Sequence, residues 1–125
     1  MTTLIVDDHA LFRSTARMLL ESEGYVVVGE AADGAEAVAS AAALHPDLVV
    51  LDVQLPDTTG FEVSRQLARD GFNGRVVLVS SRAASEYGEL VSDSGAIGFI
   101  RKDQLSGAAL ARLLEQGDVH AHCAE

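Results

Sequence analysis

Five short apolar runs alternate with five segments of helical periodicity along this chain of 125 residues. Uninterrupted apolar runs rich in branched side chains are typical of strands that are covered on both faces. Strands that alternate with helices pair in parallel through right-handed crossovers, and the helices then cover both faces of the sheet. The sequence therefore predicts an α/β fold with a parallel sheet, whose strands contain residues 4–6, 26–28, 48–51, 76–79 and 97–100.

Helix signals lie between and after these runs. Asp57 or Thr58 is expected to cap the third helix, and Gly117 is expected to end the last one. Two serines and a glycine lower the helix propensity of the fourth helix, so we expect that segment to be the most mobile part of the chain. The predicted helices cover residues 10–23, 34–44, a segment around 61–68, 84–94 and about 106–116.

The chain is long enough for one domain with a sizeable core. We assign residues 1–117 to this domain and expect residues 118–125 to form a disordered polar tail. The tail carries His120, His122 and Cys123, but three ligands do not close a structural zinc site. With one cysteine, the chain cannot form an intramolecular disulfide. The sequence leaves open whether these residues are a natural single-domain protein or an excised module.

Acidic residues outnumber basic ones, 19 against 9, which gives a formal net charge of −10. This charge disfavours direct binding to nucleic acid phosphates and favours a protein partner, a cation or a small ligand. Met1 lies just before the first apolar run, without a basic leader or a long hydrophobic stretch. We therefore expect a cytoplasmic protein that neither crosses nor binds a membrane.

Charged side chains follow three of the apolar runs. Asp7 and Asp8 follow the first, Asp52 follows the third, and Lys102, the single lysine, comes just after the last. Because the carboxyl ends of parallel strands open onto one crevice, we expect these groups to meet there. Three ionised carboxylates repel one another unless a cation binds or one of them is protonated. Oxygen ligands of this kind suit Mg²⁺, or Mn²⁺ in its place, and Mg²⁺ completes its shell with phosphate oxygens.

A phosphate is the natural third party at such a site. Lys102 could neutralise one phosphoryl oxygen, and the Ser80 hydroxyl at the end of the fourth run could donate to another. A carboxylate such as that of Asp52 can also act as the nucleophile and form an aspartyl phosphate.

These residues together resemble a known family. The pair Asp7-Asp8, the stretch 51–56 with Gly60 beyond it, Ser80 and the ending 98–102 are similar in order and spacing to the receiver domain of bacterial two-component response regulators. The resemblance covers residues 3 to about 116. It implies a flavodoxin-like (βα)5 fold with the strand order 2-1-3-4-5.

The resemblance also implies roles for the acidic residues. Asp52 would be the phosphoacceptor, Asp8 a direct Mg²⁺ ligand, Asp7 a ligand through water, and the Gln54 backbone carbonyl a further ligand. Ser80 and Lys102 would hold the phosphoryl group. The family catalyses only its own phosphotransfer and autodephosphorylation, so we do not expect an enzyme with a separate substrate.

A conformational switch is part of the resemblance. After phosphorylation Ser80 is expected to move toward the phosphoryl group, which opens space for Phe99, so the face of the fourth helix, fifth strand and fifth helix changes. By the same resemblance, Gln54 and Arg82 at the rim of the crevice are expected to influence hydrolysis of the acyl phosphate; the plainer interpretation is that they are energetically neutral loop residues. Two positions depart from the commonest pattern: Asp103 stands where proline is usual, and Phe99 where tyrosine is frequent.

The partners implied are a sensor histidine kinase or a phosphotransfer protein of a phosphorelay, and a downstream protein target. The donor is expected to dock on the first helix, around Leu11 and Ser14. The cognate kinase, the target and pairing of two copies through the switching face are left open.

Plainer interpretations exist for each residue. Acids at strand ends also occur as solvated turn residues or helix caps, His9 as a solvated helix-start residue, and Phe99 as a core aromatic.

A phosphatase of the haloacid dehalogenase type needs a second acid where this chain has Gln54, whose amide cannot transfer the proton. A flavin or nucleotide module needs a phosphate-holding loop that does not follow the first run. A receiver-shaped interaction module that works without phosphorylation stays open.

Overall fold

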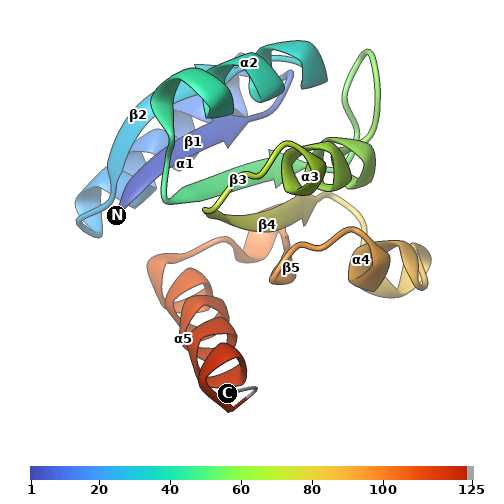
Figure 1. The fold of residues 1–125 in the computed structure, drawn as a ribbon. Helices are drawn as coiled ribbons and strands as arrows, with labels where there is room; N and C mark the ends of the chain where they lie inside the picture. Colours follow the sequence, from blue (N-terminus) through green and yellow to red (C-terminus); the bar gives the residue numbers. More distant parts are fainter. Residues whose placement is uncertain (124–125) are drawn as a thin grey trace.

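The computed structural model describes the backbone of residues 1–123 and the side chains of residues 1–115. Strands and helices alternate along it (Figure 1), and two short 3-10 helices, η1 and η2, follow β4 and β5. The strands are β1 (Thr2–Val6), β2 (Val26–Ala31), β3 (Leu48–Asp52), β4 (Arg75–Ser80) and β5 (Gly98–Arg101). The helices are α1 (Ala10–Ser22), α2 (Gly34–Leu44), α3 (Gly60–Arg69), η1 (Ala84–Glu86), α4 (Leu90–Asp93), η2 (Lys102–Gln104) and α5 (Gly107–Cys123).

The strands form one sheet in the order β2-β1-β3-β4-β5, and every pairing is parallel. This order and the alternation of elements confirm the predicted flavodoxin-like α/β fold. Because the strands run in parallel, the last residues of β1, β3 and β4 lie at one edge of the sheet. The register places Asp52 opposite Val79 and Ser80 opposite Arg101, so the polar strand ends are neighbours.

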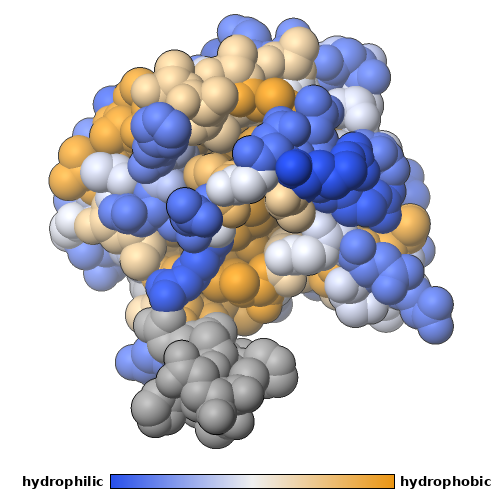
Figure 2. Space-filling view, in the orientation of Figure 1, coloured by the Kyte–Doolittle hydropathy of each residue, from blue (hydrophilic) through white to orange (hydrophobic). Residues whose placement is uncertain are grey.

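Alternating side chains of the strands build two separate cores. Leu4 and Val6 of β1 point to the face covered by α2 and α3, whereas Ile5 points to the face covered by α1 and α5. All three side chains are fully buried. On the outer surface, apolar atoms gather over the alanine-rich α2 and hydrophilic atoms over α3 (Figure 2). Helices cover both faces of the sheet, which leaves the ends of its strands as candidate positions for a functional site.

The cap of α3 differs from the prediction. Thr59, not Asp57 or Thr58, is the N-cap, and its hydroxyl accepts from the N–H of Glu62. Asp57 instead accepts from the N–H groups of Gly34 and Ala35, at 2.8 and 3.1 Å. Both N–H groups lie at the start of α2, where a helix has no acceptor of its own for them. Asp57 therefore connects two segments that are far apart in the sequence. The two bonds also hold the pKa of Asp57 below its usual range, mainly through the bond from Gly34.

The prediction of one helix over residues 84–94 is wrong. The structure has the short η1 and the four-residue α4 there, separated by Tyr87, Gly88 and Glu89. Gly88 has φ +58°, a left-handed conformation that a continuous right-handed helix does not contain. Helix α5, by contrast, continues past Gly117, where we expected it to end. A glycine keeps its backbone N–H and C=O, so it weakens a helix by about 1 kcal/mol without breaking its ladder.

The division of the chain at residue 117 stays a prediction, and residues 124–125 of the expected tail lie outside the described residues. No helix in the described part of the chain is both long enough and apolar enough to span a bilayer.

Candidate functional site

Three strand ends and one short helix supply the polar residues of the site. Asp7 follows β1 and is fully buried, Asp52 is the last residue of β3 and is 4% exposed, and Ser80 is the last residue of β4. Lys102 begins η2, directly after β5. The start of α3 can lie against the end of β3 because residue 60 is glycine, where a Cβ would overlap the backbone carbonyl of Asp52. The sequence therefore brings these groups together through the parallel sheet.

Lys102 lies between the two buried carboxylates. Its Nζ is 2.6 Å from Asp7 Oδ2 and donates to Asp52 Oδ2 at 3.3 Å. The ammonium also lies over the ring of Phe12 on α1, 4.6 Å from the ring centroid, which is a cation–π contact. One cation thus neutralises only part of the charge on two acids that are screened from water.

The excess negative charge shows in the protonation equilibria. Burial, and then the charge of Asp7, raise the pKa of Asp52 from 3.8 to about 6, and Lys102 only partly opposes them. Burial alone would lower the pKa of Lys102, but its hydrogen bond to Asp7 and the charges of Asp52 and Asp7 outweigh this and raise it. The ammonium is therefore held in its charged form, and the site favours a further positive charge.

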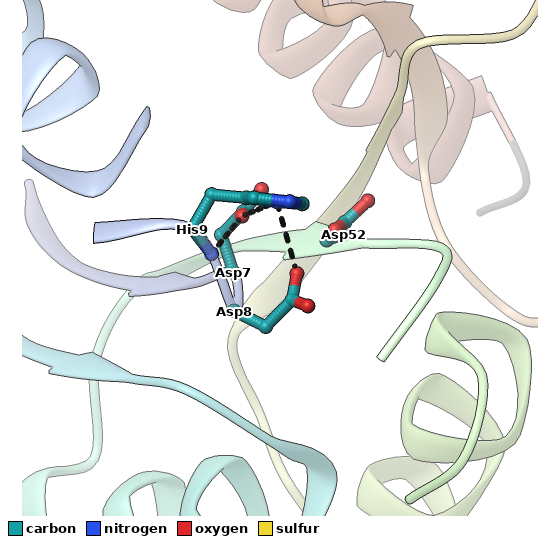
Figure 3. Close-up of side chains that lie close together, drawn as sticks. All are labelled: Asp7, Asp8, His9 and Asp52. Carbon is teal, nitrogen blue, oxygen red and sulfur yellow. Dashed lines mark hydrogen bonds and ion pairs between the residues drawn. The ribbon is translucent and has the colours of Figure 1, made fainter. Parts of the chain in front are cut away.

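The first acidic pair and Asp52 form a cluster that could hold such a charge (Figure 3). One ligand atom from each of Asp7, Asp8, His9 and Asp52 lies within 4.8 Å of the others. The carboxylates are hard oxygen ligands, and the Asp8 side chain is partly open to solvent, so the donor set fits a divalent cation such as Mg²⁺. His9, expected to be a solvated helix-start residue, is largely exposed, yet its Nδ1 lies 3.1 Å from Asp8 Oδ1 and 3.3 Å from Asp7 Oδ1.

A small pocket opens above these groups. It encloses about 160 Å³ and is lined by predicted site residues, namely Asp8, Asp52, Gln54, Ser80 and Lys102, together with His9, Leu55, Pro56 and Ser81. Asp7 is fully buried and does not line the pocket. Arg82 and Phe99 do not line this pocket; Arg82 is exposed, and its backbone N–H donates to Ser80 Oγ at 3.1 Å. The backbone N–H of Gln54 donates to Asp52 Oδ1 at 3.4 Å.

Three further residues support the site and have no signal in the sequence that singles them out. Arg13 donates from Nη1 to the Asp7 carbonyl at 2.6 Å and pairs with Glu30, which fixes the chain at the end of β1. Phe12 contacts Lys102 as described above. Tyr87 shares a hydrogen bond with Ser80, with 2.7 Å between the two hydroxyl oxygens. The Phe12 contact joins segments far apart in the chain. The Arg13 and Tyr87 contacts are local but depend on how the loops fold, so periodicity and spacing reveal none of the three.

Comparisons with known proteins agree with this arrangement. A family model described as the response regulator receiver domain matches residues 3–115. The DNA-binding transcriptional activator EvgA of Escherichia coli K12 is 33% identical over 104 residues, which are 83% of this chain and 51% of EvgA. A two-component response regulator of the LuxR family from Aurantimonas sp. SI85-9A1 has a similar structure, with a TM-score of 0.81 at 32% identity over 92% of this chain and 82% of that one.

A chain in the CheX-CheY-BeF3-Mg complex from Borrelia burgdorferi is also similar, with a TM-score of 0.81 at 27% identity over 93% of this chain and 87% of that chain. Both structural matches extend over nearly the whole sheet and its helices. The chain spans about half the length of curated relatives such as EvgA.

Proposed function

The chain belongs to the response regulator receiver domain family, as its motifs predicted, and on this premise we propose that Asp52 accepts a phosphoryl group in a Mg²⁺-dependent reaction. The donor is the phosphohistidine of a histidine kinase or of a phosphotransfer protein in the cytoplasm. The observation that carries the proposal is the position of Lys102, whose ammonium lies within ion-pair distance of both Asp7 and Asp52 at one edge of the pocket.

Asp52 has the properties of the nucleophile. Its pKa of about 6 leaves it mainly ionised at neutral pH, and it lines the pocket while being nearly buried. A carboxylate oxygen forms a bond to phosphorus as the bond from phosphorus to the histidine nitrogen breaks, and the imidazole leaves and takes up a proton from water. The product is an aspartyl phosphate, which water later hydrolyses to return the carboxylate.

Lys102 and Ser80 then hold the new group. The ammonium stands 3.3 Å from an Asp52 oxygen, so it can pair with a phosphoryl oxygen on that carboxylate. Ser80 lines the same pocket and supplies a hydroxyl donor. Asp8, Asp52 and the Gln54 carbonyl are proposed to hold the metal ion, with Asp7 behind them. Mg²⁺, or Mn²⁺ in its place, would neutralise the phosphoryl oxygens that the single ammonium leaves uncompensated.

The donor is proposed to dock on α1. Leu11 is 81% exposed and Met18 is 73% exposed, and both lie on the helix that carries Phe12 to Lys102. Large apolar side chains exposed on one helix favour contact with a partner. The signal is proposed to leave through the face of α4, β5 and α5, which contains Phe99, and to reach a downstream protein target.

The test uses acetyl phosphate and MgCl2 with intact-protein mass spectrometry. Wild type is expected to gain one hydroxylamine-sensitive phosphoryl group, and Asp52→Asn is expected to gain none. Asp103→Asn is the matched control, because this exposed carboxylate pairs with Arg101 outside the pocket, and it is expected to behave like wild type. Phosphorylation of Asp52→Asn at the wild-type rate would show that another residue is the acceptor.

A further inference from the structure

The hydroxyl of Ser80 is already engaged in the structure. Its Oγ accepts from the backbone N–H of Arg82 at 3.1 Å and lies 2.7 Å from the hydroxyl oxygen of Tyr87. Ser80 itself is 3% exposed, so water does not compete freely for these bonds. Tyr87 lies between η1 and α4, outside the strands that build the pocket. A side chain of the loop therefore reaches back to the end of β4.

The ring of Tyr87 is held by two other aromatic side chains. Its centroid is 5.3 Å from that of Phe61 on α3, at an angle of 68°, and 5.9 Å from that of Phe99 on β5, at 53°. Edge-to-face and tilted pairs at these distances are favourable, so the ring has a defined place. Tyr87 thus connects Ser80 with α3, with β5 and with the segment that leads into α4.

The Ser80 hydroxyl can form only a limited number of hydrogen bonds at one time. A serine hydroxyl has one proton to donate and two lone pairs to accept with, and Arg82 uses one of these lone pairs. If Ser80 gives its one proton to the Tyr87 oxygen, donation to a phosphoryl oxygen requires Ser80 to turn away from a phenol that is held by Phe61 and Phe99. Phe99 has no hydroxyl, so it cannot take over this bond.

Resting on the proposed function, we infer that Tyr87 is a positioning residue for Ser80 and that the phosphoryl group competes with it for the Ser80 hydroxyl. In the resting state Tyr87 holds this hydroxyl turned toward the loop. Phosphorylation draws Ser80 to the phosphoryl oxygens, which leaves the Tyr87 hydroxyl without that partner and frees the ring to move. Tyr87 lies two residues before Glu89, the N-cap of α4, and its ring contacts Phe99 on β5. Release of Tyr87 therefore changes the segment around α4 and the surface of β5 together.

The composition of the chain makes this testable without altering Tyr87. The protein has two tyrosines and no tryptophan, so Tyr25→Phe leaves Tyr87 as the source of intrinsic tyrosine fluorescence. Tyr25 packs against the core on the α1 and α5 side of the sheet, away from Tyr87. Adding beryllium fluoride with MgCl2, as a mimic of the phosphoryl group, is expected to change the fluorescence with the same midpoint as mimic binding measured by calorimetry.

Tyr87→Phe removes one oxygen and should shift the equilibrium. Losing a resting-state hydrogen bond is expected to tighten binding of the mimic by about fivefold. In a Ser80→Ala background the same substitution is expected to leave binding unchanged, a dependence that a merely structural role for Tyr87 would not produce. Tyr25→Phe is the matched control and is expected to leave mimic affinity at the wild-type value.

Different experimental outcomes overturn the proposed function and the role of Tyr87. If calorimetry detects no binding of the mimic to wild type in the presence of Mg²⁺, the proposed function fails. If the mimic binds while the Tyr87 fluorescence stays constant, or if Tyr87→Phe binds it equally or more weakly, the role of Tyr87 is overturned and the proposed function stands.

Discussion

The acid pocket and the segment from Ala83 to Ser94 are neighbours, but they are held in different ways. The pocket is built on strand ends whose side chains are buried, and its geometry is fixed by the parallel register. Of residues 83–94, Ser94 alone is buried, and the segment consists of short turns around Gly88. The comparison teaches that the proposed phosphoacceptor lies where burial and strand pairing restrict the backbone, and the proposed response lies where little burial resists a change.

The two regions also differ in electrostatics. The pocket contains uncompensated negative charge in a buried place, whereas the segment contains exposed side chains that water can screen. Substitutions that change charge in the pocket are therefore expected to change the free energy of unfolding strongly. In the segment, substitutions that alter the backbone conformation are expected to have the stronger effect. Four substitutions test this contrast.

Lys102→Met is expected to have the largest effect. It leaves the buried carboxylates of Asp7 and Asp52 without their ammonium, and breaking one partner of a buried pair lowers the free energy of unfolding by about 3–5 kcal/mol. Urea denaturation at pH 7.5 measures this loss, and MgCl2 should restore part of it. The control is Arg101→Met, which breaks an exposed pair with Asp103 and should change stability by about 1 kcal/mol or less.

Asp52→Asn is expected to stabilise the protein at neutral pH. The pKa of Asp52 is raised from 3.8 to about 6 by burial and then by Asp7, so between about pH 4 and pH 6 the folded state binds a proton that the unfolded chain has released. Wild-type stability therefore falls as pH rises through this window. Removing the charge should raise the free energy of unfolding by up to about 3 kcal/mol at pH 7.5 without metal, and by little below pH 4.

Denaturant unfolding of both proteins from pH 3.5 to 8 measures this difference. Saturating MgCl2 should narrow it, because a bound cation stabilises the wild-type pocket. An Asp52→Asn protein that is no more stable than wild type at pH 7.5 would contradict an excess of buried negative charge.

Gly88→Ala tests the backbone of the segment. Gly88 has φ +58° and open space around its Cα, so alanine meets conformational strain of about 1–2 kcal/mol without a clash. Amide hydrogen exchange of residues 83–94 is expected to accelerate at least about fivefold. Gly24→Ala is the matched change, with φ +92° and equally open space; it should lower global stability and leave exchange in the segment unaltered.

Ser64→Ala is expected to have the smallest effect. The buried Ser64 hydroxyl donates to the Ser94 carbonyl at 2.8 Å and ties the end of the segment to α3. Losing this bond should lower the free energy of unfolding by about 1 kcal/mol and speed exchange near Ser94. Ser92→Ala removes an exposed hydroxyl bonded to the nearby Glu89 carbonyl and should have no measurable effect. Equal effects of the two variants would argue against a tether at Ser64.

The sequence was most informative where a candidate site residue lies at or directly after the end of a strand. Asp7, Asp52 and Lys102 come right after buried apolar runs, so knowing that the sheet is parallel was enough to bring them together. Asp57 shows the limit of this reasoning, since its donors on α2 are not neighbours in the chain. Tyr87 shows the same limit, because no sequence pattern indicates which residue a tyrosine in a weak helical segment will contact.

The misjudged helix has a different cause. Residues 84–94 contain a polar and apolar mixture compatible with a helix, but Gly88 adopts a left-handed conformation that divides it. The summed helix propensity of residues 84–94 describes the average preference of the segment. A single residue with positive φ, Gly88, is enough to divide the helix.

Lys102 reaches the acids from the start of η2, directly after β5, which is an edge strand and the last of the described strands in the chain. A chain that has folded only through β4 brings Asp7 and Asp52 together with no ammonium between them, because Lys102 follows Asp52 by 50 residues. Without a bound cation, this repulsion is relieved only when β5 docks and brings Lys102 to the two acids, so dissolved divalent cations should stabilise a chain in which β5 has not yet docked. The charged centre is therefore completed only after the chain has been made past β5 and into η2.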